Sequence, residues 1–244
     1  MKSVLADLVG GLTPEELPQK HPFSVNKGLL HNLLNEYEEY VKHYDTFHME
    51  RFVILGNYSA EDLATFCLKT NGEAVKPYWS SFLLRHIRRC PDNNIVLHAP
   101  DFGNHFFSHN GVHIKGYLEL RGNLGNGSFD RVSCDNVQIY GNVGREFGSE
   151  LSGNVTIHGN VGSHAVHKMK SGTFTVKGIA EGQLGNMAAS GEINIKTYAG
   201  TSCGELAQKN VRFNIENAVF GKIQAWKTDA TYFVNGKEVE VERE

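Results

Sequence analysis

Histidine is the residue type with the widest range of possible chemistry in this sequence. The chain carries 12 histidines in 244 residues, and His105, His109 and His113 follow one another at intervals of four. Two histidines four residues apart on a helix can share a metal ion. Gly111 and the alternating Val112–Ile114 segment oppose a helix through all three, and no cysteine or glutamate completes a recognisable ligand set. We therefore expect surface or capping histidines and no cofactor, with a metal site at these three residues as the alternative.

Two rows of regularly spaced side chains form the second candidate site. One row is Arg121, Tyr140, His158, Lys177 and Lys196, and the other is Glu119, Gln138, Thr156, Thr175 and Asn194. If both rows face outward from stacked strands, they make a flat surface that could hold an anionic or glycan-like polymer. The alternative is that they are ordinary solvated residues of a sheet. A polysaccharide lyase would need several carboxylates projecting together, and Glu119 is the single acidic residue in either row.

The elements that must position these rows are five repeats of one short pattern. They are Leu118–Gly125, Val137–Gly144, Val155–Gly162, Phe174–Gly178 and Ile193–Thr197. Their central positions, Gly122, Gly141, Gly159, Gly178 and Thr197, are 19, 18, 19 and 19 residues apart. Each repeat alternates apolar and polar residues, as a strand with one buried face does, and most then reach a glycine corner. A period of 18–19 residues predicts a parallel β-helix.

Stacking of these coils predicts the core. Leu120, Ile139, Ile157, Val176 and Ile195 should form one interior column. Val132, Leu151, Met169, Met187 and Leu206 recur later in each coil and should form a second interior wall. Asparagines after the corner glycines, Asn123, Asn142 and Asn160, should stack into a structural ladder. Weaker coils at Ile95–Phe106 and Val211–Ile215 would bring the total from five to seven.

The first ninety or so residues instead show helical periodicity. Thr13–Glu16 forms a capping box, an amphipathic helix is expected over Asn26–His43, and another should start at Ser59 and end at Gly72. A last helix around Trp79 should stop before Pro91. We predict a mainly β protein with a helical capping or interaction domain at 1–93, the β-helix at 94–218, and a C-terminal cap at 219–244. The C-terminal cap would contain a hairpin around Asn235–Gly236 and an acidic tail.

The repeat Gly153–Gly162, followed by Met169 and Gly172, resembles the GXGXXG-type repeat domain. That domain is found at the C-terminal end of the glutamate synthase large subunit and in one of the subunits of formylmethanofuran dehydrogenase. The likeness covers roughly residues 116–209. It implies a right-handed β-helix that supports and bridges catalytic parts without holding their cofactors, and therefore a scaffold rather than glutamate or formyl chemistry.

Composition limits the partners. The 24 basic and 27 acidic residues form no basic block, which disfavours nucleic acid. No apolar run of about 18 residues and no signal peptide is present, so we expect no membrane contact and a cytoplasmic location. Four scattered cysteines agree with this expectation.

Together these features favour a non-catalytic scaffold that binds a protein partner or forms a homo-oligomer. One alternative is an enzyme, metal-dependent or not, with its site between the helical domain and the first coils, near His98, Asp101 and the three spaced histidines. Another is an effector exported by type IV secretion through its glutamate-rich C-terminus. A self-assembling structural protein, like the bactofilins, is the third.

Overall fold

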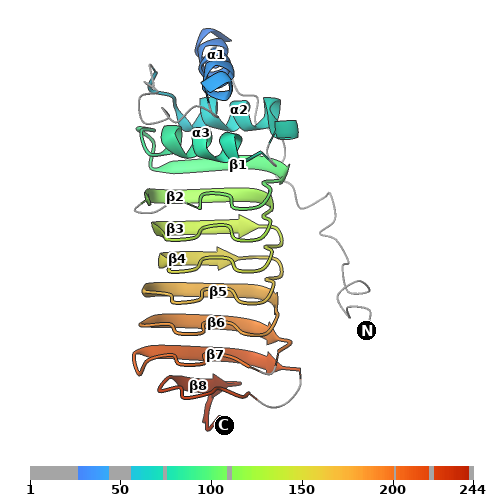
Figure 1. The fold of residues 1–244 in the computed structure, drawn as a ribbon, viewed down its shortest axis with the longest axis vertical. Coiled ribbons are helices and arrows are strands. Elements are labelled where there is room, and N and C mark those ends of the chain that lie inside the picture. Colours follow the sequence, from blue (N-terminus) through green and yellow to red (C-terminus); the bar gives the residue numbers. More distant parts are fainter. Residues whose placement is uncertain are drawn as a thin grey trace.

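The computed structural model of this chain describes residues 27–43, 56–73, 76–108, 112–200, 202–219 and 223–241. Three α-helices precede the strands: α1 (Lys27–His43), α2 (Ala60–Lys69) and α3 (Pro77–Ile87), with a short 3₁₀ turn at Asn71–Glu73. The strands are β1 (Asn94–Asp101), β2 (Val112–Asn123), β3 (Val132–Tyr140), β4 (Ser152–Ile157), β5 (Ser171–Ala180), β6 (Gly191–Tyr198), β7 (Val211–Ala218), β8 (Thr231–Val234) and β9 (Lys237–Val239). The helices lie at the β1 end of a column of strands (Figure 1).

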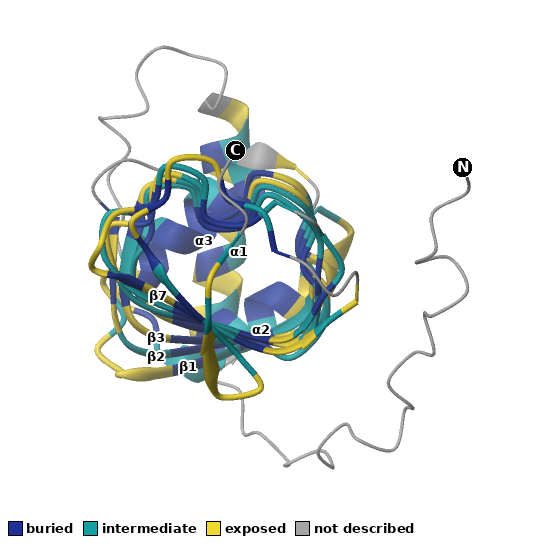
Figure 2. Ribbon diagram, turned by 90° about the horizontal axis from the view of Figure 1, so that it is seen from below, coloured by how far each residue is buried: buried dark blue, intermediate teal, exposed yellow. Residues whose placement is uncertain are grey.

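The strands form a parallel β-solenoid of about seven turns, as the repeat predicts. Neighbours in sequence are neighbours in the sheet, from β1 to β9, and every pair up to β7–β8 is parallel. Seen along the solenoid axis, successive coils overlie one another (Figure 2). The weak first and last coils are also in register, because Leu97 pairs with Leu120 and Ile195 with Ile215.

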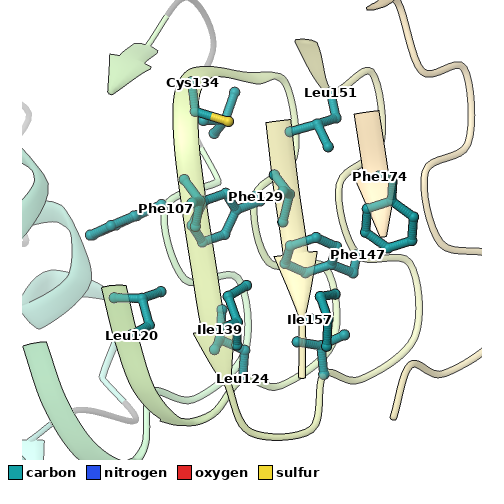
Figure 3. Packing of buried hydrophobic residues seen from close by; sticks show 14 of the residues in the cluster. Phe107, Leu120, Leu124, Phe129, Cys134, Ile139, Phe147, Leu151, Ile157 and Phe174 are labelled. Atoms are coloured by element: carbon teal, nitrogen blue, oxygen red, sulfur yellow. The ribbon is translucent and has the colours of Figure 1, made fainter. Parts of the chain in front are cut away.

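The predicted interior column is confirmed. Leu120 pairs with Ile139, Ile139 with Ile157, and Ile157 with Val176, and these side chains are buried. A row of phenylalanines packs opposite them, with Phe129 5.7 Å from Phe107 and 5.3 Å from Phe147 between ring centroids (Figure 3). Burial of these large rings, together with the aliphatic column, stabilises the solenoid.

The predicted second wall is wrong in its last two members. Val132, Leu151 and Met169 are buried, but Met187 is 42% exposed and Ala188 is buried in its place. The Ala189 amide donates to the Met169 carbonyl, so the coil after Met169 has 19 residues and Ala188 stacks on Met169. In the next coil the Gln208 amide donates to the Ala188 carbonyl, and Ala207 rather than Leu206 continues the column. The sequence predicted burial of the larger residues Met187 and Leu206, but the hydrogen-bond register between coils places the neighbouring alanines in the interior.

The corner glycines are required by the close approach of successive coils. A Cβ atom at Gly141 would lie 2.1 Å from the Gly122 carbonyl oxygen, and one at Gly159 would lie 2.3 Å from that of Gly141. Gly178 follows the same rule, with 2.4 Å to the Gly159 oxygen. The predicted alignment of Thr197 with Gly178 is wrong, because a bulge after Val176 pairs Thr197 with Ile179.

The asparagine ladder beside these glycines is confirmed. The Asn123 side-chain oxygen accepts the Asn142 amide at 2.8 Å, Asn142 accepts the Asn160 amide at 2.8 Å, and Asn160 accepts that of Ile179 at 2.8 Å. Each side chain therefore satisfies a backbone donor of the next coil at a corner where no strand pairing does so.

A second corner of each coil places non-glycine residues in the left-handed backbone region. In successive coils Arg131, Glu150, Lys168 and Met187 have φ between 54° and 59°. L-residues pay about 1–2 kcal/mol for this conformation. These residues hold it because their amides bond to the next coil: the Lys168 amide donates to the Asn186 carbonyl at 2.8 Å.

We expect Lys168→Gly to raise the free energy of unfolding by about 0.5–1 kcal/mol. Lys168 is exposed and has φ 54°, so glycine relieves the strain without removing a buried contact. The measurement is urea denaturation, with Lys168→Ala as the control because alanine keeps the strain. Equal or lower stability of the glycine variant relative to alanine would contradict the strain argument.

The start of helix α2 follows its local capping signal. Ser59 caps α2: its hydroxyl accepts the Asp62 amide, and the Asp62 carboxylate accepts the Ser59 amide. The helix ends at Lys69, before the predicted Gly72, which lies in the 3₁₀ turn. The predicted capping box at Thr13–Glu16 lies outside the described residues.

Helix α3 packs on the first coil through aromatic side chains. The fully buried Trp79 ring lies 6.1 Å from Phe102 and 6.0 Å from Phe106. The Phe107 amide donates to the Ser80 hydroxyl at 2.9 Å, which links the backbone of the coil to a side chain of the helix. Buried residues of the helices and of the solenoid therefore belong to one continuous cluster.

At the other end of the solenoid, β8 and β9 pair in antiparallel fashion. Asn235 and Gly236 connect them with φ values of 49° and 71°, which suits a tight two-residue turn. The Asn235 amide donates to the Ile215 carbonyl at 3.0 Å and holds the turn against β7.

Candidate functional site

The two predicted rows lie side by side on the outer face of the sheet, and we call this surface the ladder face. It is defined by the row His98, Arg121, Tyr140, His158, Lys177, Lys196 and Glu216 and by the row Glu119, Gln138, Thr156, Thr175, Asn194 and Asn214. The side chains point outward because each follows or precedes a buried residue of the interior column by one position. Parallel strands hold successive members of a row about 4.8 Å apart.

Three members of the first row stack on one another. The Tyr140 and His158 rings are 3.9 Å apart between centroids and inclined by 11°, and the Arg121 guanidinium lies 5.9 Å from the Tyr140 centroid. The His158 Nε2 atom is 2.8 Å from the Gln138 side-chain oxygen, which fixes the imidazole. Tyr140 is nevertheless 40% exposed. The result is a pre-arranged aromatic and cationic platform open to solvent.

The carboxylate of Glu119 is committed to its neighbours. Glu119 is 7% exposed, the Tyr117 hydroxyl donates to it at 2.6 Å, and the Arg121 Nε donates to its other oxygen. Burial, then the hydrogen bond and charge of Glu119, raise the pKa of Tyr117. This carboxylate therefore orients Arg121 rather than serving as an acid or base toward a ligand.

The two imidazoles of the ladder face are held toward their neutral forms. Burial and the Arg121 charge lower the pKa of His98, and burial and the Lys177 charge lower the pKa of His158. Neutral imidazoles at pH 7 can accept hydrogen bonds and stack, while the permanent positive charge of the face comes from Arg121 and the lysines.

A half-open hollow of about 240 Å³ lies at the C-terminal part of the ladder face. It brings together the predicted residues Thr175, Lys177 and Lys196 with Asn194. Sequence reasoning missed its other side chains: Asn214 and Glu216 continue the alternation of Val211–Ile215, which could have identified them. Phe233 also lines the hollow. It lies on β8, and only the pairing of β8 with β7 in the folded chain brings it there.

Two of the three spaced histidines lie in the described part of the chain, on different elements. His105 lies in a corner with φ 55°, whereas His113 lies on β2, with Nδ1 3.0 Å from the Ser133 hydroxyl and Nε2 3.2 Å from Asp135. His109 is outside the described residues. Among those that are described, no group of three or more histidine, cysteine, aspartate or glutamate side chains is arranged to hold a metal ion.

Comparison of the chain with protein-family models, with curated proteins and with solved structures finds no match. In the described ranges, no helix has both the length and the apolar character needed to cross a membrane.

Proposed function

We propose that this protein is a non-catalytic scaffold whose rigid solenoid presents the ladder face to a protein partner. The observation that carries the proposal is the platform of Arg121, Tyr140 and His158, stacked across three coils and open to solvent. Aromatic and arginine side chains held rigidly at a surface are the residues that contribute most binding energy in protein interfaces. The resemblance to the GXGXXG-type repeat domain, a supporting right-handed β-helix, points the same way.

In this proposal the two ends of the chain close the solenoid. Helices α2 and α3 cover the edge of β1, and the β8–β9 hairpin covers the edge of β7. Covered edges prevent sheets from adding further strands and keep a solenoid a discrete particle. Residues 1–93 would then be a capping and interaction domain, and residues 219–244 a second cap.

The test is partner recovery by the immobilised full-length protein from native lysate, quantified by mass spectrometry. We expect the double variant Tyr140→Ser, His158→Ser to recover at least about tenfold less of the specific partner than the wild type does. Lys168→Gln, an exposed substitution in a corner away from the platform, is the matched control and should recover wild-type amounts. Equal recovery by the wild type and the double variant, or substrate turnover in an unbiased metabolite screen, would overturn the proposal.

A further inference from the structure

The hollow on the ladder face is lined by two lysines that form no ion pair within the described residues. Lys177 and Lys196 lie on the adjacent strands β5 and β6, where they follow the paired residues Val176 and Ile195, and both exposed side chains line the hollow. Within the described residues, neither ammonium group has a carboxylate within 4.0 Å. Like charges on directly adjacent strands repel one another. An anion placed between the two lysines would remove that repulsion and gain two charge-assisted contacts.

Neighbouring side chains supply hydrogen-bond donors to the same hollow. The Asn194 side-chain oxygen accepts from the Asn214 amide nitrogen at 2.8 Å, and this bond fixes the orientation of Asn194. The amide nitrogen of Asn194 is then a donor with no partner among the residues that are described, and the Thr175 hydroxyl lies next to it in the same row. Asn214 is itself held by the Arg212 Nε at 2.9 Å. The donors are therefore in place before a ligand arrives.

We propose that this hollow binds the carboxylates of an acidic segment of the protein partner. The inference rests on the scaffold function proposed above and names the chemistry of its partner. Lys177 and Lys196 hold carboxylate oxygens, while Asn194 and Thr175 donate hydrogen bonds to them. The Arg212 guanidinium lies 4.0 Å from the Phe233 ring centroid and covers one face of that ring, which reduces the aromatic surface on which a sugar could stack. This favours an acidic peptide over an acidic polysaccharide.

Glu216 gives the hollow a built-in opposing charge. It follows Lys196 in the same row, because Ile195 pairs with Ile215, and it lines the hollow. Its carboxylate repels a bound carboxylate, so its removal should strengthen binding. Loss of affinity on removal of the lysines and gain on removal of Glu216 form a pair of opposite effects that a purely structural role would not produce.

The experiment measures binding of a fluorescein-labelled hexaglutamate peptide to the full-length protein by fluorescence anisotropy at low ionic strength. We expect the double variant Lys177→Gln, Lys196→Gln to bind about tenfold more weakly than wild type, and Glu216→Gln about two- to fivefold more tightly. Lys168→Gln removes one exposed positive charge in a corner away from the hollow and should bind as wild type does. Affinity should fall as salt is added. Thermal unfolding midpoints equal to that of the wild type establish that the variants are folded.

Three results would overturn the inference. They are no hexaglutamate binding at millimolar concentration, equal binding by wild type and the double lysine variant, and tighter binding of oligogalacturonate than of hexaglutamate. The last would assign the hollow to an acidic polysaccharide. Partner recovery distinguishes a failure here from a failure of the scaffold function: recovery that depends on Tyr140 and His158 but not on the lysines would retain the scaffold and exclude the acidic-segment site.

Discussion

Replacement of Gly141 by alanine is expected to lower the free energy of unfolding by about 3 kcal/mol or more. The added Cβ would lie 2.1 Å from the Gly122 carbonyl oxygen and 2.5 Å from its carbonyl carbon. Both atoms belong to the backbone of the preceding coil, so no side chain can rotate away, and the coils must separate. Separation would weaken the Asn142–Asn123 hydrogen bond and the interior column beside it. The measurement is urea denaturation followed by circular dichroism and by fluorescence of Trp79, on α3, and Trp226, between β7 and β8.

Two other glycines serve as controls that separate the steric clash of an added Cβ from the cost of a left-handed backbone conformation. Gly72 has no atom within 4 Å of an added Cβ and no positive φ, so Gly72→Ala should be neutral or stabilising by up to about 1 kcal/mol. Gly236 also has open space but φ +71°, so Gly236→Ala should cost only about 1 kcal/mol. A Gly141→Ala variant no less stable than Gly236→Ala would contradict the close approach of the coils.

The stability of the helical part should fall between pH 6.5 and pH 4 because of His86. The His86 side chain on α3 is 2% exposed, and burial, with the charges of Arg89 and Arg85, lowers its pKa from 6.5 to about 4. The Glu36 carboxylate of α1 is 3.7 Å from Nε2, too far for a hydrogen bond, and the Tyr58 hydroxyl donates to its other oxygen. Burial and the two arginine charges outweigh any attraction from Glu36, because the net shift of the His86 pKa is downward.

The sign of this pH effect follows from whether the folded or the unfolded chain binds a proton at His86. Below pH 6.5 the unfolded chain binds a proton at His86, while the folded chain remains neutral there until about pH 4. Acid therefore favours unfolding, by up to about 1.4 kcal/mol per pH unit and about 3 kcal/mol in total. Above pH 6.5 both states are neutral at this position and the effect is absent.

The measurement compares unfolding of wild type and His86→Gln between pH 7 and pH 4.5. We expect the variant to be less stable at pH 7, because it loses ring contacts with Phe82 and Tyr58, but to lose less stability on acidification. His31→Gln, at an exposed histidine of α1, is the control and should keep the wild-type pH dependence. Parallel pH profiles for wild type and His86→Gln would disprove the assignment.

The repeat pattern is sufficient to predict the solenoid, its period and much of the ladder face. Alternation in Val137–Tyr140 and Val155–His158 is a local property of strands, and repetition at 18–19 residues leaves stacking as the way to bury each apolar face. The same repetition places Lys177 next to Lys196 and Tyr140 next to His158. The start of α2 is equally local, since its cap lies within four residues.

The positions where the register shifts depend on the folded chain. Ala188 rather than Met187 faces the interior because hydrogen bonds to the preceding coil set the position, and these outweigh the preference for burying the larger side chain. The left-handed conformation of Lys168 has no signal in the residue type, since it is imposed by bonding between coils.

The hollow likewise joins β5, β6 and β7 to Phe233 and the Asn235–Gly236 turn. The docking of Trp79 on Phe102 and Phe106 joins a helix to the first coil. These contacts join a helix or a turn to the coils of the solenoid. They depend on the tertiary structure, because the sequence repeat specifies only how one coil stacks on the next.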